Sequence, residues 1–274
     1  MTTWTFEVPD DLTLDLRCAT GRVDVVAGPA GQAEVTVTDR GNGGRSLADE
    51  SRVEVTGDRL VVHVPEGGGR RSVWFVPRRL GSVAVRIALP ASTSIDAHLA
   101  SADLDVAVPL RAVAARSASG DVHLGDASGD VSINTASGDV RVGQVGGDLS
   151  VATASGDLRT GDVDRAVSVR TASGDVALGA LAGDVRVRTV SGDVAVRGLG
   201  PGDGDIASTS GDLKLAVAPG LTIHLDVSSV TGDLHSDLGA GSDDGEVDLS
   251  LRARTVSGDV TITRSQAPGG AHVV

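Results

Sequence analysis

Apolar and polar residues alternate through the centre of the chain in a unit of nine residues. In residues 140–157, VRVGQVGGDLSVATASGD, the segments VRV and LSV each place one polar residue between two apolar ones. Successive side chains of a strand point to opposite faces, so each unit predicts a short strand with two inward apolar residues and one outward residue. The predicted inward pairs are Val122 and Leu124, Val131 and Ile133, Val140 and Val142, Leu149 and Val151, Val167 and Val169, Val176 and Leu178, Val185 and Val187, and Val194 and Val196.

Two kinds of corner join these strands, and they double the period to eighteen residues. The phrase SGDV or SGDL carries Gly120, Gly138, Gly156, Gly174 and Gly192, with weaker copies midway between them. The other corner has a glycine directly after the strand, at Gly125, Gly143, Gly161 and Gly179. At the SGD corner we expect a small residue to face inward and let the coil close, at Ala118, Ala136, Ala154, Ala172 and Val190. A fixed internal period of this kind predicts stacked coils.

The expected fold is therefore all-β: a parallel β-helix or β-roll solenoid with 18-residue coils, each made of two 9-residue halves. Residues 1–92 are expected to form a β-strand and hairpin region that caps or continues the solenoid. Its clearest element is VEVTGDRLVVHV, residues 53–64, which turns at Gly57, and Ser82–Leu89 is expected to form a second hairpin arm.

The solenoid itself is expected over residues 93–264, with a disordered tail at 265–274. SADL at Ser101–Leu104 predicts one weak coil before the regular copies. After Gly192 the glycine-to-glycine steps lengthen to 19, 21 and 26 residues. The extra residues are expected to leave the coil as loops, at 198–205 and 236–246, and any site that breaks the repeat is expected there.

Composition and charge limit the kinds of partner that the chain is expected to bind. Aromatic residues are 1% of the chain, and its formal charge is −13, so nucleic acid or an anionic membrane would be repelled by most of the surface. The start of the sequence does not resemble a signal peptide, and no apolar run is long enough to span a bilayer. We therefore expect a cytoplasmic protein without an integral membrane segment. Cys18 is the single cysteine and is expected to be a buried small residue.

The aspartates of the SGD phrase allow two interpretations. Asp121, Asp139, Asp157, Asp175 and Asp193 are expected to stack in a ladder with one carboxylate per coil. Each carboxylate could accept a hydrogen bond from a backbone N–H near the start of the strand, as in Asx turns. Stacked carboxylates could instead hold a cation, as in calcium-binding β-rolls, but the glycine run that completes such oxygen cages is missing here.

No catalytic motif accompanies the repeat. The six histidines, His63, His98, His123, His224, His235 and His272, have no common ligand spacing. A GxSxG elbow, a Walker loop and a GxGxxG before a helix are all missing from the sequence. Serine and aspartate recur in every coil, which the coil itself explains. The sequence predicts a non-enzymatic protein with no cofactor and no metal.

One segment outside the repeat is a candidate docking loop. Residues 67–81, GGGRRSVWFVPRRLG, place Arg70, Arg71, Arg78 and Arg79 around Trp74 and Phe75. Arginines around exposed rings could dock on an acidic partner or a membrane surface. The other interpretation is that the rings cap the open end of the solenoid while the arginines stay solvated.

The SGDV and SGDL phrases, together with LPASTSIDAHLASADL at Leu89–Leu104, resemble an uncharacterised bacterial family of β-strand-repeat (SGDV-repeat) proteins, often labelled candidate adhesins. The resemblance covers about Val8 to Thr263. It implies a right-handed parallel β-helix or β-roll and no catalytic residues. Many members look membrane-anchored or exported, sometimes beside envelope-stress genes.

Three functions stay open at this point. The first is a protein-interaction or scaffold module, with an envelope or stress role implied by the resemblance. The second is a self-assembling, filament-like structural protein. The third is a carbohydrate-active enzyme on a β-helix, for which aromatic sugar platforms are nearly missing from the sequence. An unknown protein partner is expected for the first, and self-association for the second.

Overall fold

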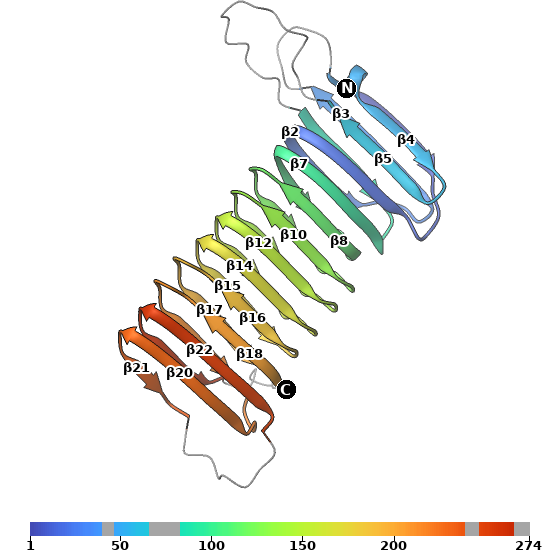
Figure 1. The fold of residues 1–274 in the computed structure, drawn as a ribbon. Coiled ribbons are helices and arrows are strands. Elements are labelled where there is room, and N and C mark those ends of the chain that lie inside the picture. Colours follow the sequence, from blue (N-terminus) through green and yellow to red (C-terminus); the bar gives the residue numbers. More distant parts are fainter. Residues whose placement is uncertain (40–46, 66–82, 239–246, 266–274) are drawn as a thin grey trace, which may run out of the picture. The chain divides into compact units, whose positions relative to one another are not determined.

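The computed structural model describes residues 1–39, 47–65, 83–238 and 247–265. It is nearly all β, and it confirms the predicted solenoid of 18-residue coils built from parallel strands (Figure 1). The chain divides into two compact units, residues 1–142 and residues 143–274. No helix in the described part of the chain has the length and apolar character needed to cross a membrane.

The first unit contains the N-terminal strands and the first coils. Its elements are β1 (Thr2–Glu7), β2 (Thr13–Ala27), β3 (Gln32–Asp39), α1 (Leu47–Glu50), β4 (Arg52–Thr56), β5 (Arg59–Val64), β6 (Val83–Leu89), β7 (Thr93–Val106), β8 (Leu110–Ser117), β9 (Val122–Leu124), β10 (Val131–Thr135) and β11 (Val140–Val142).

Parallel pairing in the first unit already begins at β2. This strand turns at Gly21, where φ is 123°, so that its two halves pair with the two halves of β7. One sheet runs β4, β5, β2, β7, β8 and β10, and the other runs β1, β3, β6, β2, β7, β9 and β11. The strands β4 and β1 at the two sheet edges pair antiparallel with their neighbours. The predicted hairpin at Gly57 is confirmed as β4 and β5, and Ser101–Leu104 lies in a coil as predicted.

The second unit contains the remaining coils. Its strands are β12 (Leu149–Ser155), β13 (Leu158–Thr160), β14 (Val167–Ser173), β15 (Val176–Leu181), β16 (Val185–Arg188), β17 (Val194–Leu199), β18 (Gly202–Ala207), β19 (Leu213–Val217), β20 (Ile223–Thr231), β21 (Leu234–Ser236), β22 (Leu249–Ser257) and β23 (Val260–Arg264).

The last two coils are stacked in a different order from their order along the chain. The first sheet of this unit runs β12, β14, β16, β18, β22 and β20, and the second runs β13, β15, β17, β19, β23 and β21. The coil of β22 and β23, which is last in sequence, therefore lies between its two predecessors, and Figure 1 shows β22 beside both β18 and β20. The coil of β20 and β21 is outermost among the described strands.

The core consists of the inward pairs that the alternation predicts. Every predicted pair from Val122 and Leu124 to Val194 and Val196 is buried. In the parallel register each residue stacks on its counterpart in the next coil, as Val167 does on Val185 and Val176 does on Val194. Burial of these branched side chains stabilises the coil by about 1.5–3 kcal/mol per fully buried residue.

The prediction for the SGD corner is wrong in one respect. Ala118, Ala136, Ala154, Ala172 and Val190 point outward, and Val190 is 54% exposed. The residue before each is turned inward instead, and in four coils it is a buried threonine. Thr171 donates its hydroxyl hydrogen to the carbonyl of Ser173 at 3.1 Å. This bond satisfies the buried hydroxyl and closes the turn that Gly174 completes with φ of 116°.

The predicted loop at residues 198–205 is also wrong in part. Residues from Gly202 onward form β18, which pairs with β16 and β22. The register shift lies just before it, between Val196 and Leu199 of β17. Of the second predicted loop, residues 239–246 lie outside the described part, as do most of the predicted tail and the candidate docking loop at 67–81.

Candidate binding surface

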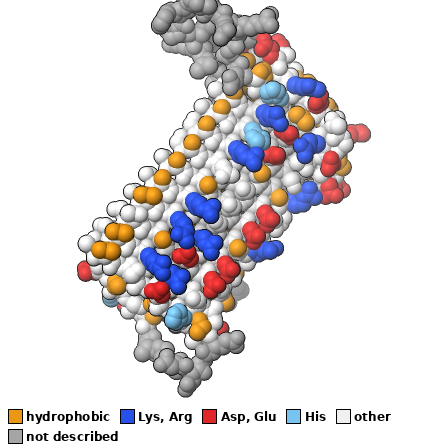
Figure 2. Space-filling view, in the orientation of Figure 1, with side chains coloured by type: hydrophobic (Ala, Val, Ile, Leu, Met, Phe, Trp, Pro, Cys, Tyr) orange, Lys and Arg blue, Asp and Glu red, His pale blue; other side chains and the backbone are white. Residues whose placement is uncertain are grey.

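Five arginines gather on the outward face of the first sheet of the second unit. We call them the arginine surface: Arg170 on β14, Arg186 and Arg188 on β16, and Arg252 and Arg254 on β22. The register places Arg170 directly beside Arg188. Strands lie about 4.8 Å apart, so these side chains share one patch. Figure 2 shows it as a group of blue side chains with red ones between them.

Two aspartates hold four of the five arginine side chains in place. Oδ2 of Asp205 lies 2.7 Å from Nη2 of Arg188 and 3.9 Å from Nε of Arg186. Oδ2 of Asp226 lies 3.1 Å from Nε of Arg252 and 3.6 Å from Nη2 of Arg254. The hydrogen bond from Arg252 and the positive charges beside it hold the pKa of Asp226 below its usual value. Exposed pairs of this kind contribute little stability, so their main effect is orientation.

Positive charge remains after these pairs are counted. The outward faces of β14, β16, β18, β22 and β20 carry five arginines against three aspartates, Asp203, Asp205 and Asp226, in a chain whose formal charge is −13. In the register Ala207 lies between Arg188 and Arg254, so the side chain at the position between these two arginines is only a methyl group. Guanidinium groups bind carboxylates through two parallel N–H donors. The surface can therefore accept an anionic group at this position.

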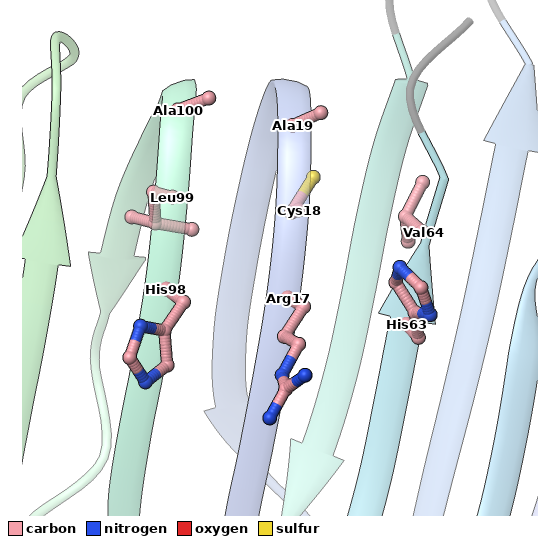
Figure 3. A pocket seen from close by; sticks show the side chains of 8 residues that line it. All are labelled: Arg17, Cys18, Ala19, His63, Val64, His98, Leu99 and Ala100. Atoms are coloured by element: carbon pink, nitrogen blue, oxygen red, sulfur yellow. The ribbon is translucent and has the colours of Figure 1, made fainter.

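A second basic row crosses the outward face of the first unit, and aspartates lie beside it. His63, Arg17 and His98 lie side by side on β5, β2 and β7 and border a hollow of about 280 Å³ (Figure 3). Asp15 lies 3.5 Å from Arg17, and the carboxylate of Asp96 lies 3.3 Å from the ring of His98. Asp15 also lies 3.5 Å from Arg59, so one carboxylate is shared by two arginines of this face.

Cys18 borders the same hollow and confirms its predicted role. Its side chain is 2% exposed, and burial raises the pKa of the thiol to about 11. The thiol is therefore protonated at neutral pH, whereas the thiolate is the nucleophile and the metal ligand.

The aspartate ladder exists, and its bonds run between coils. The N–H of Asp193 donates to Oδ1 of Asp175 at 3.0 Å, and the N–H of Asp212 donates to Oδ1 of Asp193 at 2.8 Å. The first unit repeats the arrangement between Asp121 and Asp139, at 2.9 Å. The predicted backbone donor is confirmed, but it belongs to the next coil and not to the same turn. Among the described residues no cluster of three or more His, Cys, Asp or Glu side chains is arranged to hold a metal ion.

The candidate residues Arg70, Arg71, Trp74, Phe75, Arg78 and Arg79 all lie outside the described residues. The alternation does not point to the arginine surface, because it marks a residue as outward without distinguishing one outward residue from another. One signal was present: Arg170 and Arg188 occupy the same position of successive 18-residue copies. The contribution of Arg252 and Arg254 depends on the exchanged coil order, which the spacing does not reveal.

The stacked coils place the chain among the β-solenoid proteins. Residues 14–263 match the family model described as Toastrack DUF4097, and the chain belongs to this family. No curated protein matches the sequence.

Similar solved structures include two candidate adhesins and a candidate lipid-binding protein. One adhesin is from Bacteroides fragilis NCTC 9343 (11% identity, TM-score 0.46, 95% of this chain and 96% of that chain). The other is from Parabacteroides distasonis ATCC 8503 (14%, 0.42, 95% and 96%). The lipid-binding candidate is from the same strain (13%, 0.39, 97% and 96%).

Proposed function

We propose that the protein is a non-catalytic interaction module that docks an acidic segment of a protein partner on the arginine surface. The observation that carries the proposal is the excess of arginine on adjacent strands of an otherwise acidic chain. A flat sheet face presents these guanidinium groups in fixed register, which suits carboxylates along an extended or folded acidic segment. The overall charge of −13 repels longer polyanions such as nucleic acid.

Charge reversal at the centre of the surface is the direct test. We expect the double substitution Arg188→Glu/Arg254→Glu to weaken binding of a labelled poly-glutamate peptide at least about tenfold, measured by fluorescence anisotropy at low salt. Removing one acid, with Asp205→Asn, is expected to strengthen binding, because it leaves more positive charge uncompensated. Raising the salt concentration is expected to weaken binding of the native chain.

The second sheet of the same unit offers a matched control. Arg159 and Arg197 are exposed there and form ion pairs with Asp157 and Asp162. Arg159→Glu/Arg197→Glu makes the same change in total charge away from the arginine surface. Equal loss of binding in both double variants would show only a general charge effect and would refute the proposal. If the protein bound anionic vesicles but not the peptide, the partner would be a membrane and the proposed protein partner would be wrong.

The loop at residues 67–81 remains a second proposed contact. Aromatic residues and arginine are the side chains that most often dominate binding energy at protein interfaces. We expect Trp74→Ala/Phe75→Ala to reduce recovery of a partner from lysate in a pull-down, relative to the native chain. Equal recovery of every partner by both proteins would remove the loop from the proposal.

A further inference from the structure

The outermost described coil of the second unit leaves its apolar side chains partly uncovered. Ile223 stacks on Leu249, Leu225 on Leu251 and Leu234 on Val260, so the coil continues the inward columns. Leu234 is nevertheless 53% exposed, and Ile223 and Leu225 are half-buried, whereas their three counterparts in the next coil are at most 2% exposed. Among the described residues nothing covers the outer side of these columns.

The strand β20 also has a free backbone edge. The N–H of Leu249 donates to the carbonyl of Thr222 at 3.2 Å, so Thr222 directs its backbone groups toward β22. Backbone groups alternate in direction along a strand, which sends the N–H and C=O of Ile223, Leu225 and Val227 to the opposite edge. That edge pairs with no described strand. It spans nine residues without proline or lysine, which are common protections of sheet edges.

We infer that two copies of the chain associate by antiparallel pairing of β20 with β20 about a two-fold axis at Leu225. In this register Leu225 faces the partner's Leu225, and Ile223 faces the partner's Val227, so apolar residues meet on the inner side. The backbone groups that point to the free edge then pair with one another. Two sheets become continuous across the axis.

Side chains on the outer face select this register. His224 lies opposite the partner's Asp226, and the reverse pair forms on the other side of the axis. Both arginine contacts of Asp226 use Oδ2, which leaves Oδ1 to accept a hydrogen bond from the imidazole. In this register His224 and the partner's Asp226 exchange no backbone hydrogen bonds. Facing residues of this kind bring their side chains closest together. A shift that centres the axis on Asp226 would place two carboxylates face to face, which is unfavourable.

A second copy of the chain fits this edge, because the proposed pairing is two-fold symmetric. A two-fold interface uses the same strand from both chains, so association through it stops at two. Self-association, one of the alternatives left open by the sequence, is thereby limited to a closed dimer at this edge. The inference does not rest on the proposed acidic partner, because the interface lies at the sheet edge. Its test measures the molecular mass of the protein alone.

Light scattering after size-exclusion chromatography, run across protein concentration, tests the dimer. We expect the native chain to shift from monomer to dimer mass and Leu225→Pro to stay a monomer with an unchanged circular dichroism spectrum. Proline is tolerated at this position because the lost N–H points to the free edge. A native chain that is monomeric at every concentration, or a Leu225→Pro variant that still dimerises, would overturn the inference.

A charge swap tests the register without touching the backbone. His224→Asp is expected to raise the dimer dissociation constant at least about tenfold, because two like charges then face each other. The combined variant His224→Asp/Asp226→His restores opposite partners and is expected to recover most of the affinity. Failure of the swap to recover affinity would refute this register. Dimerisation that appears only after removal of residues 266–274 would mean that the tail occupies the edge, and would also refute the inference.

Discussion

Replacing Gly174 with alanine is expected to lower the stability of the second unit by about 3 kcal/mol or more. Gly174 has φ of 116°, a conformation that costs L-residues energy, and an added Cβ would lie 2.2 Å from the carbonyl oxygen of Gly156 in the preceding coil. Backbone cannot yield as a flexible side chain can, so coils above and below must shift. The melting temperature is expected to fall by about 10 °C.

Gly220 provides the control for this substitution. Its φ is 84°, yet an added Cβ would have no heavy atom within 4 Å. Gly220→Ala therefore tests the cost of the backbone angle alone and is expected to lose about 1 kcal/mol. Similar losses for Gly174→Ala and Gly220→Ala in calorimetry would contradict the role of close coil stacking.

Leu213→Ala is expected to cost about 2–5 kcal/mol, whereas Leu234→Ala is expected to cost less than about 1 kcal/mol. Both leucines occupy the same inward column, because each stacks on Val260 from one side. Leu213 is 0% exposed and Leu234 is 53% exposed. Alanine leaves a cavity only where the space was enclosed. Denaturant unfolding of both variants at low protein concentration measures the difference.

Leu234→Ala, compared with Val260→Ala, also tests the order of the coils. If β23 were outermost, as the sequence order suggests, Leu234 would be enclosed and Val260 would face the open end. A large loss for Leu234→Ala together with a small loss for Val260→Ala would then be observed. That outcome would contradict the arrangement in which β23 lies between β19 and β21.

The sequence predicted the coil because the coil is encoded locally. Alternation within VRV or LSV determines which side chains face inward, and the eighteen-residue step aligns them, as with Val167 and Val185. The side chain that turns inward at the SGD corner was harder to assign. Threonine is polar, and its burial becomes favourable only with the hydrogen bond that Thr171 makes to Ser173.

The candidate site depended on information that spacing does not contain. Steps of 21 and 26 residues indicate that chain is inserted, but they do not tell which coil lies beside which. Arg252 joins Asp205 and Asp226 in one patch only because β22 lies between β18 and β20. Arg188 and Arg170 could have been placed together from their period alone.

The exchanged coil order also has a kinetic consequence during synthesis. Residues 223–236 leave the ribosome before residues 249–264, so β20 and β21 emerge before their final neighbours exist. The edges of β18 and β19 are then open and present the same apolar columns, which makes them a ready docking site for the premature coil. The last coil must afterwards take that place and receive β20 on its far side. We therefore expect a late exchange of strand partners during folding. In chains truncated before Leu249, β20 is expected to stay beside β18.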